Sequence, residues 1–330
     1  MAVTITDVAT VAGLSVSTVS RALSQAGEVA PATRDRVQQI ADDLGYRPNP
    51  AARSLRAGRR GSVALVVPDL ANPFFGPVTK AIRSRLQRAG TTLLLGDSDE
   101  RPAEERAATQ ALRGQVDALV LWASTLDDAE LQKLAGSLPV VLVNREVPGL
   151  ATVRIDLGPG ITQAVEHLVA LGHRRCAFVN CSQRPSHRDE TIRAAAASGG
   201  LELVELGPYH PDVDAGRHAA ALIHARGEVT AVLGHNDLVA LGMLQHLQEK
   251  GSRVPADLSV ISIDDTILAA SASPSLSTVR IDPVVVADAV ADLLTALTDP
   301  NRSSDTRPAG IGVTTRFVPR QSSGPAPQDR

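Results

Sequence analysis

The stretch SVSTVSRAL, Ser15–Leu23, combines hydroxyl side chains with a single arginine on a segment that also holds apolar residues. Hydroxyl and guanidinium groups donate hydrogen bonds to phosphates and base edges, and arginine is the natural partner of a guanine edge. Val19, Ala22 and Leu23 are expected to face inward from a helix. The outward face is then polar but barely charged, which suits the major groove of DNA, and it carries Val16, Ser17, Ser20 and Arg21.

No catalytic or metal-binding pattern competes with this interpretation. Ser, His and Asp do not follow a catalytic order, and the eight histidines are scattered. Cys176 and Cys181 lack a metal-ligand spacing, so we expect packing roles for both. The LGPG run at 157–160 has no Walker lysine or full GxGxxG sequence beside it, which indicates a loop-to-helix start. We therefore expect no enzyme activity, no cofactor and no metal site.

Three helical patterns surround the hydroxyl-rich stretch. The first spans 5–12, with Thr4 as its N-cap and Gly13 at its end, and the second follows at once with Ser15 as N-cap. The third begins at Pro31, a residue suited to a first helical position, and its apolar residues recur at helical spacing. The sequence therefore predicts a small helix-turn-helix bundle.

Charge separates this N-terminal segment from the rest of the chain. Residues 1–60 hold eight arginines against five acidic residues, a net charge of +3. Because the whole chain has a net charge of −3, the remaining residues carry −6. No acidic residue occurs between positions 44 and 68, a stretch that contains Arg47, Arg53, Arg56, Arg59 and Arg60. A polyanion is expected to bind residues 1–60 rather than the remainder.

Bulk properties indicate a globular, multidomain protein. A chain of 330 residues that is 43% hydrophobic can bury more than one core. No apolar run approaches the roughly 18 to 20 residues of a membrane span. The N-terminus MAVTITDVAT lacks the basic and apolar regions of a signal peptide. We therefore expect a cytoplasmic protein, associated with the nucleoid.

Beyond residue 61, apolar runs alternate with amphipathic stretches, as in repeated strand–helix–strand units with parallel sheets. Strands are predicted at SVALVVP, TTLLLG, DALVLW, PVVLVN, CAFVN, LELVEL, TAVLG and LSVISI. Helices are predicted at 76–90, 103–114, 127–136, 158–171, 188–198, 213–226, 236–250 and 283–298. Because the pattern restarts at 158–171, we predict the α/β class, with an all-α headpiece followed by two lobes of doubly wound parallel sheets.

Ligands of such sheets bind outside the carboxyl ends of the strands, and two facing lobes bring those ends to one cleft. The chain has seven aromatic residues, and four of them are expected on this rim: Phe74, Phe75, Trp122 and Tyr209. Polar side chains expected at the same strand ends include Asn144, Asn236 and Asp264. Flat apolar faces beside amide and carboxylate groups suit a polyol ring.

The run TITDVATVAGLSVSTVSRAL and the segment VAPATRDRVQQIADDLGYRPNPAARSLRAGRRGSVALVVPD are similar to the DNA-binding headpiece and hinge of the LacI/GalR family of bacterial transcription regulators. The resemblance continues through NPFF, EHLVALGHRR, LGHNDLVALGMLQHL, VPADLSVISIDD, PSLSTVRID and FVPRQSS. It therefore covers nearly the whole chain.

The resemblance implies roles for single headpiece residues. Val16, Ser17 and Arg21 match base-contacting positions of the recognition helix. Phosphate contacts are implied for Ser15, Thr18, Thr33, Tyr46 and Asn49. Ala30 replaces the serine that relatives usually carry before the third helix, so the cap that serine provides is missing.

The hinge segment AARSLRAG is barely two helical turns long, and such a helix is marginal alone in water. In the family, two such helices of a dimer pair in the minor groove, and a leucine, here Leu55, wedges between base pairs and kinks the duplex. Leu55 has no evident core to join. We expect this helix to fold only with a partner.

The resemblance also implies domain boundaries. A headpiece at 1–46 and a hinge at 47–61 precede an effector-binding and dimerisation core at 62–320 with the periplasmic-binding-protein-like fold. The first lobe comprises 62–155 and 283–312, the second 156–282, with crossings near Ile155, Asp282 and Val313. The tail at 321–330 is Pro/Gly/Ser-rich and expected to be disordered. Without a leucine-heptad helix, a dimer is expected rather than a tetramer.

In the core, Arg188 matches the family's effector-binding arginine, and Asn144, Asn236 and Asp264 match its hydrogen-bonding positions. Thr191 replaces the glycine that the family usually has three residues after this arginine, which weakens that match. Asp264 as a turn residue and Arg188 as a surface residue at a helix start stay open as alternatives.

These features predict a sequence-specific transcriptional regulator, a repressor of carbohydrate uptake or catabolism genes that binds a pseudo-palindromic operator as a homodimer. A small sugar-like effector would control operator binding. Two alternatives stay open: a sugar-binding transport protein, which would not use residues 1–60, and a regulator with a non-sugar, nucleobase-like corepressor. The residues do not identify the effector, the operator, or whether the effector acts as inducer or corepressor.

Overall fold

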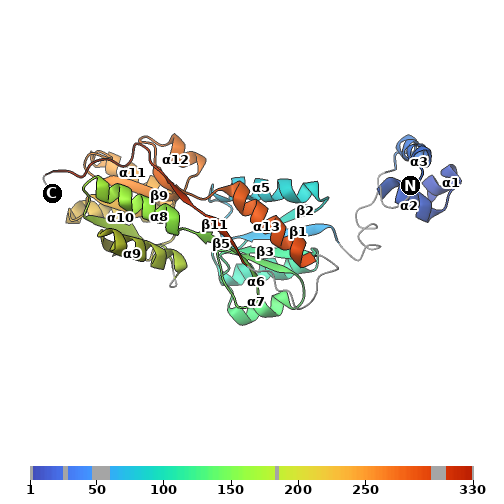
Figure 1. Cartoon of the computed structure of the whole chain (residues 1–330), viewed down its shortest axis with the longest axis horizontal. Coiled ribbons are helices and arrows are strands. Elements are labelled where there is room, and N and C mark those ends of the chain that lie inside the picture. The colour runs from blue at the N-terminus through green and yellow to red at the C-terminus, as the bar shows by residue number, and fades with distance from the viewer. Residues whose placement is uncertain (1–2, 25–28, 47–59, 183–185, 299–309, 329–330) are drawn as a thin grey trace. The chain divides into compact units, whose positions relative to one another are not determined.

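The computed structural model describes residues 3–24, 29–46, 60–182, 186–298 and 310–328. Two compact units divide the chain, Met1–Gly61 and Ser62–Arg330, and we call them the headpiece and the core. Figure 1 shows an all-helical headpiece and a core with two sheets. The predicted α/β class is confirmed.

The headpiece contains α1 (Ile5–Ala12), α2 (Val16–Ser24) and α3 (Pro31–Asp43). The Thr4 hydroxyl accepts from the Asp7 N–H, and the Asp7 carboxylate accepts from the Thr4 N–H at 2.8 Å, so a capping box begins α1. Gly13, at φ 65°, ends it. Val8, Val19 and Val37 meet in a fully buried core. The predicted helices and caps are confirmed.

Six parallel strands form the first sheet of the core, in the order β11-β5-β4-β3-β1-β2. Their bounds are β1 (Ser62–Val67), β2 (Thr92–Asp97), β3 (Ala118–Trp122), β4 (Val140–Val143), β5 (Ala151–Asp156) and β11 (Ile311–Thr314). One face is covered by α5 (Phe75–Arg88) and α13 (Pro283–Thr298), which lie side by side in Figure 1, and the other by α6 (Pro102–Arg113) and α7 (Asp128–Ala135).

The second sheet has the order β12-β10-β9-β8-β6-β7 and is parallel except for its edge strand β12. Its strands are β6 (Arg175–Val179), β7 (Glu202–Leu206), β8 (Ala231–Gly234), β9 (Ser259–Asp264), β10 (Ser277–Arg280) and β12 (Arg316–Val318). One face packs on α8 (Gly158–Ala170) and α9 (His187–Gly199), and the other on α10 (Val213–Arg226), α11 (Asp237–Glu249) and α12 (Ile267–Ser271).

Both sheets are buried on two faces, which explains why their strands read as continuous apolar runs. Val63 and Leu65 of β1 face α5 and α13, whereas Ala64 faces the opposite layer. The chain passes between the sheets three times: from β5 into α8, from β10 into α13, and from β11 into β12. These crossings join the two sheets into one core.

The expectation of a disordered tail is wrong for residues 321–328, which the structure describes. Ser322 is fully buried, and its carbonyl accepts from the Val260 N–H of β9 at 2.7 Å. The Gly324 carbonyl accepts from the Ser259 hydroxyl at 3.1 Å and lies 3.0 Å from Nε2 of the buried His173. Small polar residues are ordered here because they satisfy buried groups of the second sheet.

Candidate functional site

The residues predicted to contact DNA begin at the N-terminus of α2. The Ser15 hydroxyl caps this helix by accepting from the Thr18 N–H at 3.1 Å, and it lies 2.8 Å from the hydroxyls of both Ser17 and Thr18. The structure therefore brings three predicted contacts together at the end of a helix that carries the positive pole of its dipole. Such a cluster can receive a phosphate.

Ser17 and Arg21 are exposed on α2, and the Arg21 Nε donates to the Ser17 carbonyl at 3.4 Å. The outward orientation predicted for Val16 is only partly correct, because this half-buried side chain also packs against the headpiece core. Thr33 and Tyr46 are half-buried, and Tyr46 packs against the same core. Asn49 and Leu55 lie outside the described residues.

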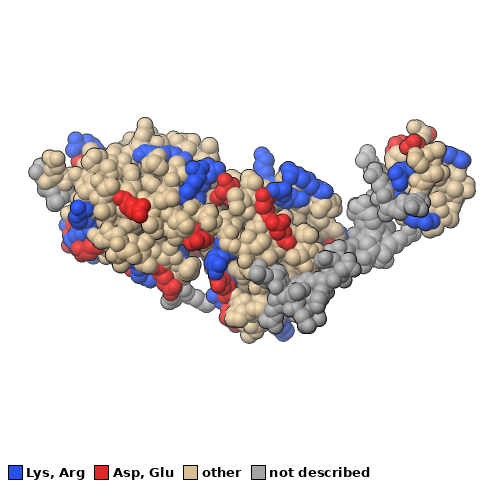
Figure 2. Space-filling model, viewed as in Figure 1, with Lys and Arg blue, Asp and Glu red and all other residues tan. Residues whose placement is uncertain are grey.

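The described headpiece is not itself basic. Its described residues hold four arginines, Arg21, Arg34, Arg36 and Arg60, against four aspartates, and Figure 2 shows acidic as well as basic side chains on its visible face. The positive balance of the N-terminal segment therefore comes from Arg47, Arg53, Arg56, Arg59 and Arg60, all but the last outside the described residues.

A cleft of about 530 Å³ lies in the core at the carboxyl ends of both sheets. Seven of the eight predicted effector residues line it: Phe74, Phe75, Trp122, Asn144, Arg188, Asn236 and Asp264. The eighth, Tyr209, is not among the residues that line the cleft, and its half-buried side chain packs against the apolar core of the second lobe. The rule that ligands bind at strand ends thus brought seven of the eight predicted residues to one cleft.

Three aromatic rings form the wall that the first lobe contributes. Trp122 lies edge-to-face against Phe74 and Phe75, with ring centroids 5.6 and 5.5 Å away, and the two phenylalanines are 5.2 Å apart. Each ring is only 6 to 7% exposed. Separate open flat faces were expected, but the rings stabilise one another as one packed wall.

Asp264 is the most unusual group in the cleft. It is 6% exposed, its backbone has a φ of 118°, and its carboxylate accepts no hydrogen bond from any residue that the structure describes. Burial raises the pKa of this carboxyl well above its ordinary value, the charge of Asp237 raises it further, and Arg188 opposes the shift. A largely buried acceptor without a protein donor is costly unless water or a ligand in the cleft supplies one.

Arg188 begins in the first turn of α9 and reaches the end of β8, where its Nη1 donates to the His235 carbonyl at 2.9 Å. This bond holds the guanidinium inside the cleft. Arg188 lies close enough to Asp264 to affect its pKa, although the two residues come from different strand-to-helix loops. Together they offer a cation and an acceptor to adjacent hydroxyls of one ligand.

The two predicted asparagines differ in what they can offer. Asn236 is 4% exposed, and its Oδ1 accepts from the Val239 N–H at 2.9 Å, so most of its side chain serves as the N-cap of α11. Asn144 is exposed at the end of β4, with a φ of 56°. Its amide is therefore the freer hydrogen-bonding group of the two.

Sequence analysis missed Glu100 and His235, which also line the cleft. Burial raises the pKa of Glu100, and its Oε2 lies 3.9 Å from Nε2 of His210 in the other lobe. Burial lowers the pKa of His235 well below its ordinary value, and its Nδ1 has no partner among the described residues. Both residues follow predicted strands, so the same strand-end rule could have found them.

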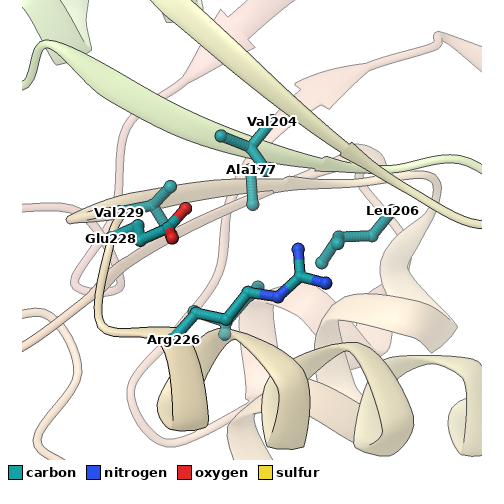
Figure 3. Close-up of a pocket in the computed structure, with 7 residues that line it drawn as sticks. Ala177, Val204, Leu206, Arg226, Glu228 and Val229 are labelled. Carbon is teal, nitrogen blue, oxygen red and sulfur yellow. The ribbon is translucent and has the colours of Figure 1, made fainter.

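A second cavity, of about 10 Å³, lies beside β6, β7 and α10 (Figure 3). Apolar side chains such as Ala177 and Val204 line it, and Arg226 extends toward Leu206. This volume holds about one water molecule. It is a packing void rather than a ligand site.

The described residues give little support for metal binding, a membrane span or a reactive cysteine. These residues contain no group of three His, Cys, Asp or Glu side chains arranged for a metal ion, and no helix among them is long and apolar enough to cross a membrane. Cys176 and Cys181 are free and buried within apolar clusters, and burial raises the pKa of each thiol to about 12. Thiols with such pKa values are poor nucleophiles at neutral pH.

Two family models match the chain: one for bacterial regulatory proteins of the lacI family over residues 4–49, and one for a periplasmic binding protein-like domain over 165–323. The HTH-type transcriptional regulator GalR of Escherichia coli K12 is 34% identical over 308 residues, which cover 90% of this chain and 89% of GalR. GalS of Salmonella typhimurium LT2 is 36% identical over 288 residues, 84% of this chain and 85% of GalS.

Among solved structures, a lac repressor dimer bound to operator and the anti-inducer ONPF has a TM-score of 0.83 and 25% identity, covering 98% of this chain and all of that one. A complex of the transcriptional regulator CelR with cellobiose has a TM-score of 0.70 and 28% identity, covering 97% of this chain and 99% of that one. Similarity across headpiece and core alike shows that this chain belongs to the lacI family of DNA-binding transcriptional regulators.

Proposed function

We propose that this regulator is a repressor of carbohydrate genes, acting at the nucleoid, whose operator binding is controlled by a small sugar-like effector held in the cleft. The observation that carries the proposal is Asp264, a carboxylate that is 6% exposed, lines the cleft and accepts no hydrogen bond from the described residues. A sugar hydroxyl would supply the missing donor.

The other groups of the cleft support the same ligand class. The Arg188 guanidinium lines the cleft, Asn144 offers an exposed amide from the first lobe, and the aromatic wall presents apolar ring surface to the C–H face of a sugar. The related CelR structure is a cellobiose complex. A cleft of about 530 Å³ falls within the usual range for small-ligand sites.

Control of DNA binding requires that the effector prefer one arrangement of the lobes. A ligand that touches Asn144 in the first lobe and Asp264 in the second binds better when the lobes are closed around it. Only this difference in affinity can shift the lobes, and with them the hinge segments that carry Leu55. An inducing effector would thereby weaken operator binding.

The operator-binding form is proposed to be a homodimer, with Val16, Ser17, Arg21 and Leu55 toward bases and Ser15, Thr18, Thr33, Tyr46 and Asn49 toward the backbone. The related lac repressor structure is a dimer bound to operator. On the core, Ile267 and Leu268 at the start of α12 are 71% and 40% exposed, and such large apolar side chains suit burial against a second copy. Ile267→Asp should raise the dimer dissociation constant, measured by sedimentation.

The effector proposal is tested by titrating the full chain with mono- and disaccharides while following the fluorescence of Trp122, the one tryptophan of the chain. Arg188→Ala should weaken binding of any sugar found by about 1.5 to 3 kcal/mol, the range for hydrogen bonds to charged groups. Arg193→Ala is the matched control, because Arg193 lies on the same helix but pairs with Glu205 on the surface.

Operator affinity measured with and without the sugar completes the test. Both variants should bind operator like wild type when no sugar is present, and only Arg188→Ala should resist release by the sugar. Equal sugar affinity in wild type and Arg188→Ala would place the pocket elsewhere. A nucleobase that binds the cleft and tightens operator binding would instead establish the corepressor alternative.

A further inference from the structure

Glu105 lies in the first turn of α6 and is only 2% exposed. It is not one of the residues proposed to contact the ligand. Its carboxylate turns toward the segment after β3. Oε2 accepts from the Thr125 N–H at 2.8 Å and from the Thr125 hydroxyl at 2.7 Å, and Oε1 accepts from the Ser124 hydroxyl. No ion pair joins Glu105 to a cation among the described residues, and its hydrogen-bond donors are the Ser124 hydroxyl and the Thr125 N–H and hydroxyl.

The segment that Glu105 holds is a strained turn of the cleft. Ala123 has a φ of 46°, a backbone conformation that an alanine rarely adopts. Such a conformation persists only where its surroundings determine it. The Ala123 N–H is bound to the Val143 carbonyl at 2.8 Å on one side, and Glu105 anchors the next two residues on the other.

The same turn carries much of the ligand wall that the first lobe contributes. Trp122 directly precedes it, and Ala123, Ser124 and Thr125 all line the cleft. The edge-to-face contacts of Trp122 with Phe74 and Phe75 require that its backbone be fixed. Trp122 is the last residue of β3 and is paired with Val143 of β4, so freeing the turn would loosen the strand end that carries the tryptophan, together with the hydroxyl side chains beside it.

We propose that Glu105 is a positioning residue of the effector cleft: its buried carboxylate holds the turn from Trp122 to Thr125, so that the aromatic wall is formed before ligand arrives. Pre-organisation of this kind raises ligand affinity, because the conformational entropy of the wall is lost during folding and not when the ligand binds. The effect on ligand binding rests on the proposed function, whereas the effect on Trp122 does not.

The test compares Glu105→Gln in the full chain with Glu104→Gln, its exposed neighbour in the same turn of α6. A carboxamide keeps the size of Glu105 but replaces one acceptor oxygen with a donor that faces protein donors. In the ligand-free protein, Glu105→Gln should shift the Trp122 emission to longer wavelength and increase its quenching by acrylamide. Glu104→Gln should match wild type in both measurements.

Thr125→Val, which removes one hydroxyl donor and leaves the backbone bond, should give a smaller change of the same sign. It also decides the question if Glu105→Gln fails to fold. The dissociation constant of a sugar that binds wild type should rise about tenfold in Glu105→Gln, as expected from the loss of a charge-assisted hydrogen bond. Operator binding without sugar should stay unchanged.

Emission and quenching equal to wild type in Glu105→Gln and Thr125→Val would overturn the positioning role. If no sugar binds the wild-type protein, the proposed function fails, but the ligand-free fluorescence still decides the role of Glu105. The two failures are therefore distinguishable.

Discussion

At the scale of single residues, Asp264 shows how a binding group costs stability. Its pKa in the folded protein lies well above the ordinary value of 3.8, mainly because of burial. Between these two pKa values the folded state keeps a proton that the unfolded state has released. Stability is therefore lost as the pH rises from 3.8 through the raised pKa, and the cost is absent below 3.8.

Asp264→Asn should accordingly stabilise the ligand-free protein at pH 7, by about 1 to 3 kcal/mol. Asparagine carries no charge to bury, and it tolerates a positive φ. The melting temperature should rise at pH 7, and the difference from wild type should shrink as the pH falls toward 4. The same variant should bind the effector more weakly, because its amide cannot replace a carboxylate acceptor.

Asp265→Asn is the control, since the neighbouring carboxylate is 5% exposed but pairs with Arg320 at 2.6 Å. Removing this charge takes the anionic partner from both Arg320 and Arg280, so the variant should melt at a lower temperature than wild type. Destabilisation by both substitutions would show that Asp264 has a partner in solution.

At the scale of elements, α3 starts without a side-chain cap, because Ala30 occupies its N-cap position. The Thr33 N–H bonds only to the Ala30 carbonyl, at 3.0 Å. Ala30→Ser should add an acceptor for this N–H and stabilise the helix by about 1 kcal/mol. Hydrogen exchange of the α3 amides should slow in Ala30→Ser and remain unchanged in Ala32→Ser, which lies inside the helix. Faster exchange in Ala30→Ser would contradict the missing-cap interpretation.

A second prediction at the scale of elements concerns the expected hinge helix. It rests on the family resemblance, because Leu55 lies outside the described residues. Leu55→Ala should weaken operator binding and remove the central kink of the DNA, since the lost contact exists only in the complex. Sugar affinity and melting temperature should stay near wild type. Circular-permutation gel shifts measure the bend, and an unaltered bend with unaltered affinity would reject the wedge.

At the scale of the whole molecule, the proposed dimer demands an operator with dyad symmetry, because each subunit presents the same recognition helix. The arginines of residues 47–60 should make binding depend steeply on salt, with affinity falling by about a hundredfold or more between 50 and 200 mM. Footprinting and binding isotherms at several salt concentrations test both points. Protection of one unrepeated half-site by a monomer would contradict them.

Much of this architecture could be predicted from the sequence, because the relevant physics is local. Capping by Thr4 and Ser15, the helical start at Pro31 and the apolar runs of the long strands each depend on residues a few positions apart. Strands β5 and β10 were not assigned from their patterns, because polar residues interrupt their apolar runs: Thr152 and Arg154 in β5, and Ser277 and Thr278 in β10. Strand-end positions located most of the cleft, because parallel strands bring their carboxyl ends to one edge.

Only the tertiary structure decided the properties of these groups. The raised pKa of Asp264, the edge-to-face packing of Trp122 and the contact of Glu105 with Thr125 depend on neighbours that approach from other elements. The order of residues 321–328 arises from hydrogen bonds to Val260 and Ser259, about 60 positions away in sequence. Type and spacing determined which residues meet at the cleft, whereas burial and partners from distant segments determined what each can do there.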